Sequence, residues 1–322
     1  MATELTAARY GKTKVRVFRI VREGSWHNIV EYNVEALVEG DIATSYTEAD
    51  NSVVVATDSI KNITYYLAKV SPHILNAERF ALHLGTFLVS KYAHLSKAFV
   101  TVEQLRWTRI HVAGEASPEG HSHSFYRDGD DKRVVNAVID ATGGKDKLVA
   151  TVTSGVTDLL VLKSTGSGFT NFYRDEYTTL VEVDDRIFST SVDLTYTFAP
   201  LQIAAPTDEK KLEFVTPLQR GEEGYDGSVW DEEVPGRARA ATLETFAVDE
   251  SASVQATLYK MGERIIAENG SVISVSYSLP NKHYVPVDMR YIGVDNLTPS
   301  KAEVFTPIAA PSGLIKATIS RK

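Results

Sequence analysis

A strict alternation of apolar and polar positions over residues 188–198 is the feature that most constrains how this chain can fold. Every second residue from Phe188 to Phe198 suits a buried position, and Ser, Asp and Thr fill the positions between them. Side chains of a strand point alternately to its two faces, so the pattern predicts a long strand with one buried face. The stretch from Ile273 to Leu279 alternates in the same way. The chain therefore contains sheet that is covered on one face only.

Two further segments, 74–88 and 254–265, instead repeat apolar residues at the spacing of an amphipathic helix. Asp249, Ser251 or Ser253 is a candidate cap for the second helix, and Gly270 lies just past its end. Weaker alternation predicts other strands, near 15–17 and at about 27–38, 98–112, 133–141 and 149–163. The order strands, helix, strands thus occurs twice, with a junction near residue 145. This order predicts the α+β class, with antiparallel sheets that carry helices on one face.

One stretch, at about 199–237, interrupts this order because it is rich in proline, glycine and acidic residues. We interpret it as an acidic, solvated surface insertion in the second half of the chain. A binding loop is the alternative interpretation.

Composition narrows the possible chemistry. The chain has no cysteine, which excludes disulfides, thiolate catalysis, iron–sulfur clusters and cysteine zinc sites. Its net charge of −8 argues against a general nucleic-acid binder. No apolar run is long enough for a membrane helix, and the first residues lack the apolar core of a secretion signal, so we expect a soluble, intracellular protein.

Recognisable cofactor motifs are missing: we find no phosphate-binding loop, dinucleotide fingerprint, zinc-protease motif or serine-hydrolase elbow. The pair His121 and His123 could hold a metal ion, but no third ligand lies near it in the sequence. A structural role for this pair is the preferred interpretation. We therefore expect no metal and no organic cofactor.

Polar clusters at the ends of the predicted elements carry a resemblance to a known family. They are Tyr10-Gly11-Lys12, Ala56-Thr57-Asp58-Ser59, His123-Ser124-Phe125, Leu162-Lys163-Ser164-Thr165 with Gly168-Phe169, Arg174-Asp175-Glu176-Tyr177-Thr178-Thr179, Asp185-Arg186-Ile187, Ser253-Val254-Gln255-Ala256-Thr257 and Leu279-Pro280-Asn281-Lys282-His283-Tyr284. In this order and spacing they resemble urate oxidase (uricase), especially the fungal members, from about residue 8 to residue 320. The resemblance implies two tandem T-fold domains, at 8–144 and 145–322, and a homotetrameric, tunnel-shaped barrel with active sites at subunit interfaces.

The resemblance also implies an activity. Members of the family oxidise urate with molecular oxygen to 5-hydroxyisourate and hydrogen peroxide in purine catabolism, and they use no cofactor. Many eukaryotic members carry a peroxisomal address of the Ser-Lys-Leu type, which implies the peroxisome. This chain ends in Ser320-Arg321-Lys322, so the cytoplasm stays open as an alternative.

Residue roles follow from the same resemblance. Phe169 matches the phenylalanine that stacks on the purine, and Arg186 matches the arginine that binds the urate anion, although a salt bridge to Asp185 is an alternative role for Arg186. Gln255 and the N–H of Val254 match the groups that bind the opposite edge of urate, and Asn281 matches the asparagine beside the oxygen site. Thr57 and Asp58 match substrate-binding residues that come from the neighbouring subunit.

Catalysis is implied to depend on Lys12, Thr57 and His283, which match the family's proton relay. A lysine acts as a base when burial or neighbours depress its pKa. Two rivals stay open at this point: another T-fold enzyme that acts on a pterin, and a non-catalytic purine-binding or scaffold protein with the same fold.

Overall fold

The computed structural model describes residues 3–114, 118–214 and 231–322. Its contacts divide the chain into two compact units. The first comprises Met1–Gly155 and Tyr196–Glu232, and the second comprises Val156–Thr195 and Glu233–Lys322. The chain changes from one unit to the other three times: inside β5, inside β6 and just before α4. The domain boundary expected at 144/145 stays a prediction.

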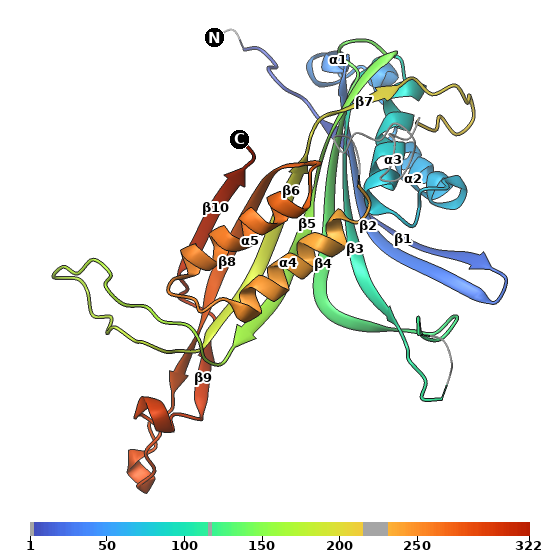
Figure 1. Cartoon of the computed structure of the whole chain (residues 1–322). Helices are drawn as coiled ribbons and strands as arrows, with labels where there is room; N and C mark the ends of the chain where they lie inside the picture. Colours follow the sequence, from blue (N-terminus) through green and yellow to red (C-terminus); the bar gives the residue numbers. More distant parts are fainter. Residues whose placement is uncertain (1–2, 115–117, 215–230) are drawn as a thin grey trace. The chain divides into compact units, whose positions relative to one another are not determined.

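The first unit is a sheet with helices on one face (Figure 1). Its first four strands pair antiparallel in chain order, and β5 follows β4 and also pairs with β7. Helix α3 contacts β3 and β4, and α2 contacts β1. The elements are β1 (Tyr10–Glu23), β2 (Trp26–Gly40), α1 (Ala43–Thr47), η1 (Asn51–Val53), α2 (Thr57–Val70), α3 (Ala77–Lys91), β3 (Leu95–Arg109), β4 (Phe125–Asp140), the start of β5 (Lys147–Lys163) and β7 (Leu201–Ala204).

The core of the first unit lies between this sheet and α3. Alternate residues of β2, including Val34, Ala36 and Val38, are buried, as the period of a half-covered strand requires. Helix α3 is buried along almost its whole length, and Asn76 caps it by accepting a hydrogen bond from the Arg79 N–H at 3.0 Å.

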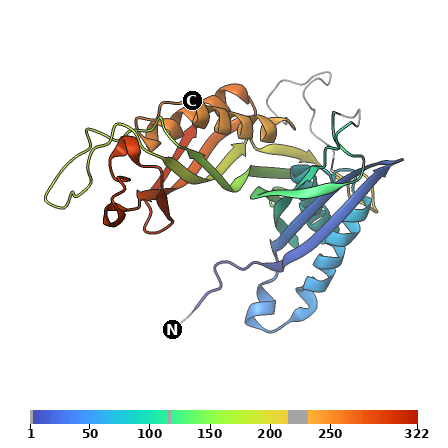
Figure 2. The same ribbon diagram turned by 90° about the horizontal axis from the view of Figure 1, so that it is seen from below.

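The second unit repeats the plan. The end of β5 is followed in the sheet by β6, β8 and β10, and β9 pairs with the end of β8. Helices α4 and α5 contact each other and lie over one face of these strands, as Figure 2 also shows. The elements are β6 (Phe188–Phe198), α4 (Val234–Val248), α5 (Val254–Glu268), β8 (Val272–Pro286), η2 (Arg290–Ile292), η3 (Pro299–Lys301), β9 (Phe305–Ile308) and β10 (Leu314–Ser320).

These elements confirm the α+β class expected from the sequence. Strand β6 has the predicted bounds, and α3 and α5 correspond to the two predicted helices. Helices α2 and α4 were not predicted. In α2 the buried positions Ile60, Thr64, Leu67 and Ala68 follow the helical period, but one of them is a threonine, whose hydroxyl is satisfied by the Ile60 carbonyl at 2.9 Å.

Within 199–237 the residues 207–211 are exposed, whereas other described parts of the segment belong to the fold, so the interpretation as a solvated insertion is too broad. Leu201 and Ile203 are buried in β7, Phe214 is also buried, and residues from 234 onward begin α4. The acidic part at 215–230 lies outside the described residues. None of the described helices combines the length and the apolar character needed to cross a membrane.

Candidate active site

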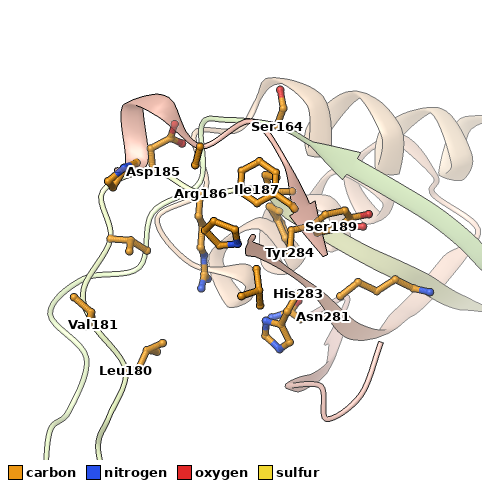
Figure 3. A pocket seen from close by; sticks show the side chains of 18 of the residues that line it. Ser164, Leu180, Val181, Asp185, Arg186, Ile187, Ser189, Asn281, His283 and Tyr284 are labelled. Carbon is orange, nitrogen blue, oxygen red and sulfur yellow. The ribbon is translucent and has the colours of Figure 1, made fainter. Parts of the chain in front are cut away.

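A cavity of about 460 Å³ lies in the second unit, between the end of β8, the segment that leads into β6, and the segment around η3 (Figure 3). Three of the predicted site residues line it: Arg186, Asn281 and His283. Much of the remaining lining is apolar and includes Leu180, Val181, Ile187, Leu297 and Phe305. A mainly apolar cavity with a few convergent polar groups is the usual form of a small-molecule site.

Strand β8 positions Asn281 and His283. The two residues are separated by one position, so both side chains project to the same face of the strand. The Asn281 N–H donates to the Gly313 carbonyl at 2.8 Å, and His283 pairs with Ile308 of β9. The side-chain oxygen of Asn281 is buried and has no hydrogen-bond partner among the described residues. A buried polar atom without a partner indicates a missing water or ligand.

Phe169 and Arg186 lie together on the loops that precede β6. The guanidinium carbon of Arg186 lies over the Phe169 ring, 5.2 Å from its centroid. Backbone hydrogen bonds fix both residues: Phe169 and Val183 exchange bonds of 2.8 and 3.1 Å, and the Arg186 N–H donates to the Ser167 carbonyl at 2.8 Å. Phe169 also stacks on Phe172, with the ring centroids 4.9 Å apart.

Arg186 forms no ion pair with any acidic side chain in the ranges that the structure describes. Its neighbour Asp185 instead accepts hydrogen bonds from the Thr165 hydroxyl at 2.6 Å and from the Gly166 N–H at 2.7 Å. The salt bridge that the sequence left open as an alternative is therefore not formed. Arg186 is half-buried, and this burial lowers its pKa. A partly desolvated cation without a counter-ion favours an anionic ligand.

The start of α5 is tied to the same loops. Ser253 caps the helix by accepting from the Ala256 N–H at 3.1 Å, and Val254 is buried whereas Gln255 is exposed. Two backbone bonds join Ser251 to the loop ahead of Phe169: Gly168 N–H to Ser251 O at 2.9 Å, and Ser251 N–H to Gly166 O at 3.0 Å. The first N–H groups of a helix and the positive end of its dipole suit an anion.

In the first unit a β-bulge determines where Lys12 points. The β1–β2 register shifts between Lys12 and Val15, so that three steps along β1 match two steps along β2. Lys12 consequently pairs with Ala36, which is buried on the helix-covered face. Simple alternation from Val15 would instead place the Lys12 side chain on the other face of the strand. Lys14 within the bulge has a φ of 56°, in the left-handed region. Lys12 is therefore half-buried on the side of α2.

Thr57 and Asp58 begin α2 close to this lysine. The Tyr10 hydroxyl accepts from the Val55 N–H at 2.7 Å, which ties the start of β1 to the segment before the helix. A hydrogen bond and the charge of Lys61 lower the pKa of Asp58, and the charge of Lys12 contributes in the same direction. Lys12 and the first turn of α2 are thus neighbours.

The predicted site residues therefore form two groups, one in each unit. Lys12, Thr57 and Asp58 belong to the first unit; Phe169, Arg186, Val254, Gln255, Asn281 and His283 belong to the second. The sequence did not predict the hydrogen bond between Thr165 and Asp185. The local feature that points to it is the glycine-rich stretch 165–168, in which Gly166 has a φ of 78°.

The histidine pair considered as a metal site lies in the first unit. The rings of His121 and His123 are 4.5 Å apart and edge to face, and the Ser122 hydroxyl is 2.9 Å from Nδ1 of His123. Within the described ranges, no group of three or more His, Asp or Glu side chains is arranged to hold a metal ion.

Fold and geometry together define a class: an α+β protein whose second unit holds Phe169, the half-buried Arg186 and the start of α5 together, an arrangement that we call the cradle. The family model of uricase matches residues 8–138 and 152–316. The uricase of Emericella nidulans is 44% identical over 99% of this chain and 97% of that protein, and the uricase of Aspergillus flavus is 44% identical over 98% and 96%. This chain belongs to the uricase family.

Solved structures agree with this membership. The crystal structure of uricase from Arthrobacter globiformis superimposes with a TM-score of 0.80 at 30% identity, covering 100% of this chain and 96% of that one. A urate oxidase from Bacillus sp. TB-90 shares the fold, with a TM-score of 0.75 at 22% identity over 98% of this chain and 100% of that one.

Proposed function

We propose that this chain oxidises urate with molecular oxygen to 5-hydroxyisourate and hydrogen peroxide, without a metal or an organic cofactor, as a step of urate degradation. The observation that carries the proposal is the half-buried guanidinium of Arg186, which lies over the Phe169 ring and has no ionic partner among the described side chains. Urate is a planar anion, and this pair offers it an aromatic face and a cation. Membership of the uricase family supports the same substrate.

Binding uses both edges of the purine. The ring of Phe169 stacks on the heterocycle in an offset arrangement. The fork of Arg186 donates to two adjacent acceptors, which a lysine cannot do with the same geometry. The side chain of Gln255 and the N–H of Val254 bind the opposite edge, at the positive end of the α5 dipole.

The chemistry consists of moving protons and two electrons. Lys12, Thr57 and His283 relay protons and generate the electron-rich urate anion, and Asn281 holds oxygen or water beside the ring. Urate gives up two electrons and oxygen takes them up together with two protons as hydrogen peroxide. A water oxygen adds to the oxidised ring and becomes the hydroxyl of 5-hydroxyisourate. The chain contributes positioning and electrostatics, and the substrate is the reductant.

The site is shared between the subunits of a homotetramer, in which Lys12, Thr57 and Asp58 face the cradle of a partner subunit. Two observations support this arrangement. The two groups of site residues belong to separate compact units, and all residues that line the described cavity come from the second unit. For the location in the cell we propose the peroxisome, on the family resemblance, with the cytoplasm as the alternative; fractionation of expressing cells distinguishes the two.

The assay follows the loss of urate absorbance together with oxygen uptake and peroxide release. We expect equal amounts of urate consumed, oxygen consumed and peroxide formed, and no effect of a chelator. Binding of urate without turnover would identify a non-catalytic purine-binding protein and overturn the proposal. Inhibition by the chelator that added metal reverses would overturn the cofactor-free mechanism.

A further inference from the structure

The carboxylate of Asp185 fastens the loop 165–168, which leads into Phe169; we call these contacts the Asp185 clamp. The Thr165 hydroxyl donates to its Oδ2 at 2.6 Å, and the Gly166 N–H donates to its Oδ1 at 2.7 Å. The Ser167 N–H adds a longer contact of 3.4 Å to the same Oδ1. Both oxygens of the carboxylate are therefore used by consecutive residues of the loop 165–168.

This loop lies between the two other parts of the cradle. On one side it exchanges backbone hydrogen bonds with Ser251, two residues before the cap of α5. On the other side the Ser167 carbonyl accepts from the Arg186 N–H, and Phe169 pairs with Val183. A shift of the loop therefore moves the aromatic face relative to both the guanidinium and the helix start.

The backbone of the loop has little freedom to compensate. Gly166 has a φ of 78°, a conformation that residues other than glycine rarely adopt. A Cβ at Gly168 would lie 3.0 Å from the Asp184 carbonyl, so the loop passes close to the backbone of the segment that leads into β6. Loops of this kind keep their shape when side-chain acceptors satisfy their N–H groups.

The same contacts keep Asp185 away from its neighbour Arg186. Hydrogen bonds from the Thr165 hydroxyl, and then from backbone N–H groups, hold the pKa of Asp185 below its usual range. The carboxylate is thus ionised, and both of its oxygens accept hydrogen bonds from the loop. Arg186 consequently has no described carboxylate as a partner, and its guanidinium is free to bind an anion.

We propose that Asp185 is a positioning residue of the substrate site, which fastens the loop 165–168 so that Phe169 stacks on the purine and so that Arg186 stays available to it. This inference rests on the proposed urate oxidase function. It assigns Asp185 no contact with substrate.

The test is binding of urate without turnover. In the absence of oxygen the electron acceptor is missing, so calorimetry measures a dissociation constant for urate on the intact protein. For Asp185→Ala we expect this constant and the KM to rise about tenfold or more, because a charge-assisted clamp is lost, whereas kcat falls less. Asp185→Asn keeps one acceptor oxygen and should lie between Asp185→Ala and the wild type.

Controls separate this role from a general structural one. Asp184→Asn changes the adjacent, exposed aspartate and should bind urate as the wild type does. Thr165→Val removes one donor to the clamp and should weaken binding in the same direction as Asp185→Ala. If Asp185→Ala lowers the melting temperature but leaves the dissociation constant and the KM unchanged, the positioning role is overturned. If the wild type binds urate but does not oxidise it, the proposed function fails. The calorimetric comparison of Asp185→Ala with the wild type still tests the role of Asp185 in that case.

Discussion

The guanidinium of Arg186 lies over the ring of Phe169, 5.2 Å from its centroid, on two segments that are joined by backbone hydrogen bonds, by the Asp185 clamp and by the bond from the Asn171 N–H to Glu182. Among the described residues, Arg186 has no ion-pair partner, and burial lowers its pKa. Phe169 stacks on Phe172, another loop residue. The pair thus places a cation beside an aromatic ring outside the apolar core.

Replacing Arg186 by lysine tests whether urate binding depends on the two parallel N–H donors of the guanidinium group. The variant keeps the positive charge but loses the two parallel donors, so the KM for urate should rise about tenfold or more, with a smaller effect on kcat. Steady-state kinetics over a range of urate concentrations measure both. Arg290→Lys, at an exposed arginine that pairs with Asp288, is the control. Equal KM values for Arg186→Lys and wild type would contradict the assigned role.

Replacing Lys12 by methionine tests the proton relay. Turnover should fall by about a hundredfold or more, the usual contribution of a positioned general base, while urate still binds in the absence of oxygen. Thr57→Ala should act in the same direction. Lys14→Met changes an exposed lysine two residues away and should turn over like the wild type. Unchanged turnover in Lys12→Met would remove Lys12 from the mechanism.

A fully buried histidine, His83, and a half-buried one, His73, predict a loss of stability in mild acid. His83 lies fully buried between the Ser71 hydroxyl and the Lys211 carbonyl, each at 2.8 Å, and His73 lies 3.0 Å from Glu213. Burial lowers the pKa of both histidines, against the opposing effects of the Lys211 carbonyl on His83 and of Glu213 on His73.

Because these pKa values are lower in the folded state, the unfolded chain binds the extra protons first. The stabilisation is fully present above the unfolded pKa of about 6.5 and is lost as the pH falls from there toward the lowered values, by up to about 1.4 kcal/mol per pH unit for each histidine. Urea unfolding between pH 8 and pH 5 measures this slope. His83→Gln should flatten it, and an unchanged slope would show that other groups cause it.

A buried ion pair in the first unit gives a prediction on stability alone. Glu78, 1% exposed, accepts from Arg133 Nε at 3.1 Å and from the Ser154 hydroxyl at 2.6 Å. Glu78→Met should cost up to about 3–5 kcal/mol of unfolding free energy, because the partly buried charge of Arg133 is left without its partner. The double variant Glu78→Met with Arg133→Met should be less destabilised than either single one.

The matched control is an exposed pair in the second unit, Arg264 with Glu244. Glu244→Gln should leave the midpoint of denaturant unfolding nearly unchanged. If Glu78→Met also unfolds at the wild-type midpoint, the buried pair does not stabilise the first unit.

The sequence predicted the elements in which buried apolar residues outnumber the buried polar ones and recur at the period of the structure. Strand β6 also buries Thr190, helix α3 buries Glu78 and α5 buries Thr257, but their apolar residues still show the period. Helix α2 was missed because it has few buried apolar positions, and α4 was missed because its apolar residues lie on several sides of the helix and its start contains Pro235 and Gly236. A proline fits the first turn of a helix, where its missing N–H costs nothing.

The candidate site was predicted from the family resemblance and not from the local pattern. Alternation places Lys12 on the open face of β1 together with Arg16, and no local signal shows the bulge that reverses this assignment. The clamp on Phe169 was missed for a related reason: Asp185 and Thr165 are twenty positions apart, and only the folded loop brings them together.

The bulge in β1 also bears on how a fold of this kind can change over generations. Loss of one codon between Lys12 and Val15 would remove the extra residue and restore a regular ladder, in which Lys12 still pairs with Ala36 and Val15 with Val34. The lysine would therefore stay on the side of α2, and Val15 and Val17 would stay in the core. A change of chain length by one residue at this point can thus be absorbed without moving the reactive amine to the other face of the strand.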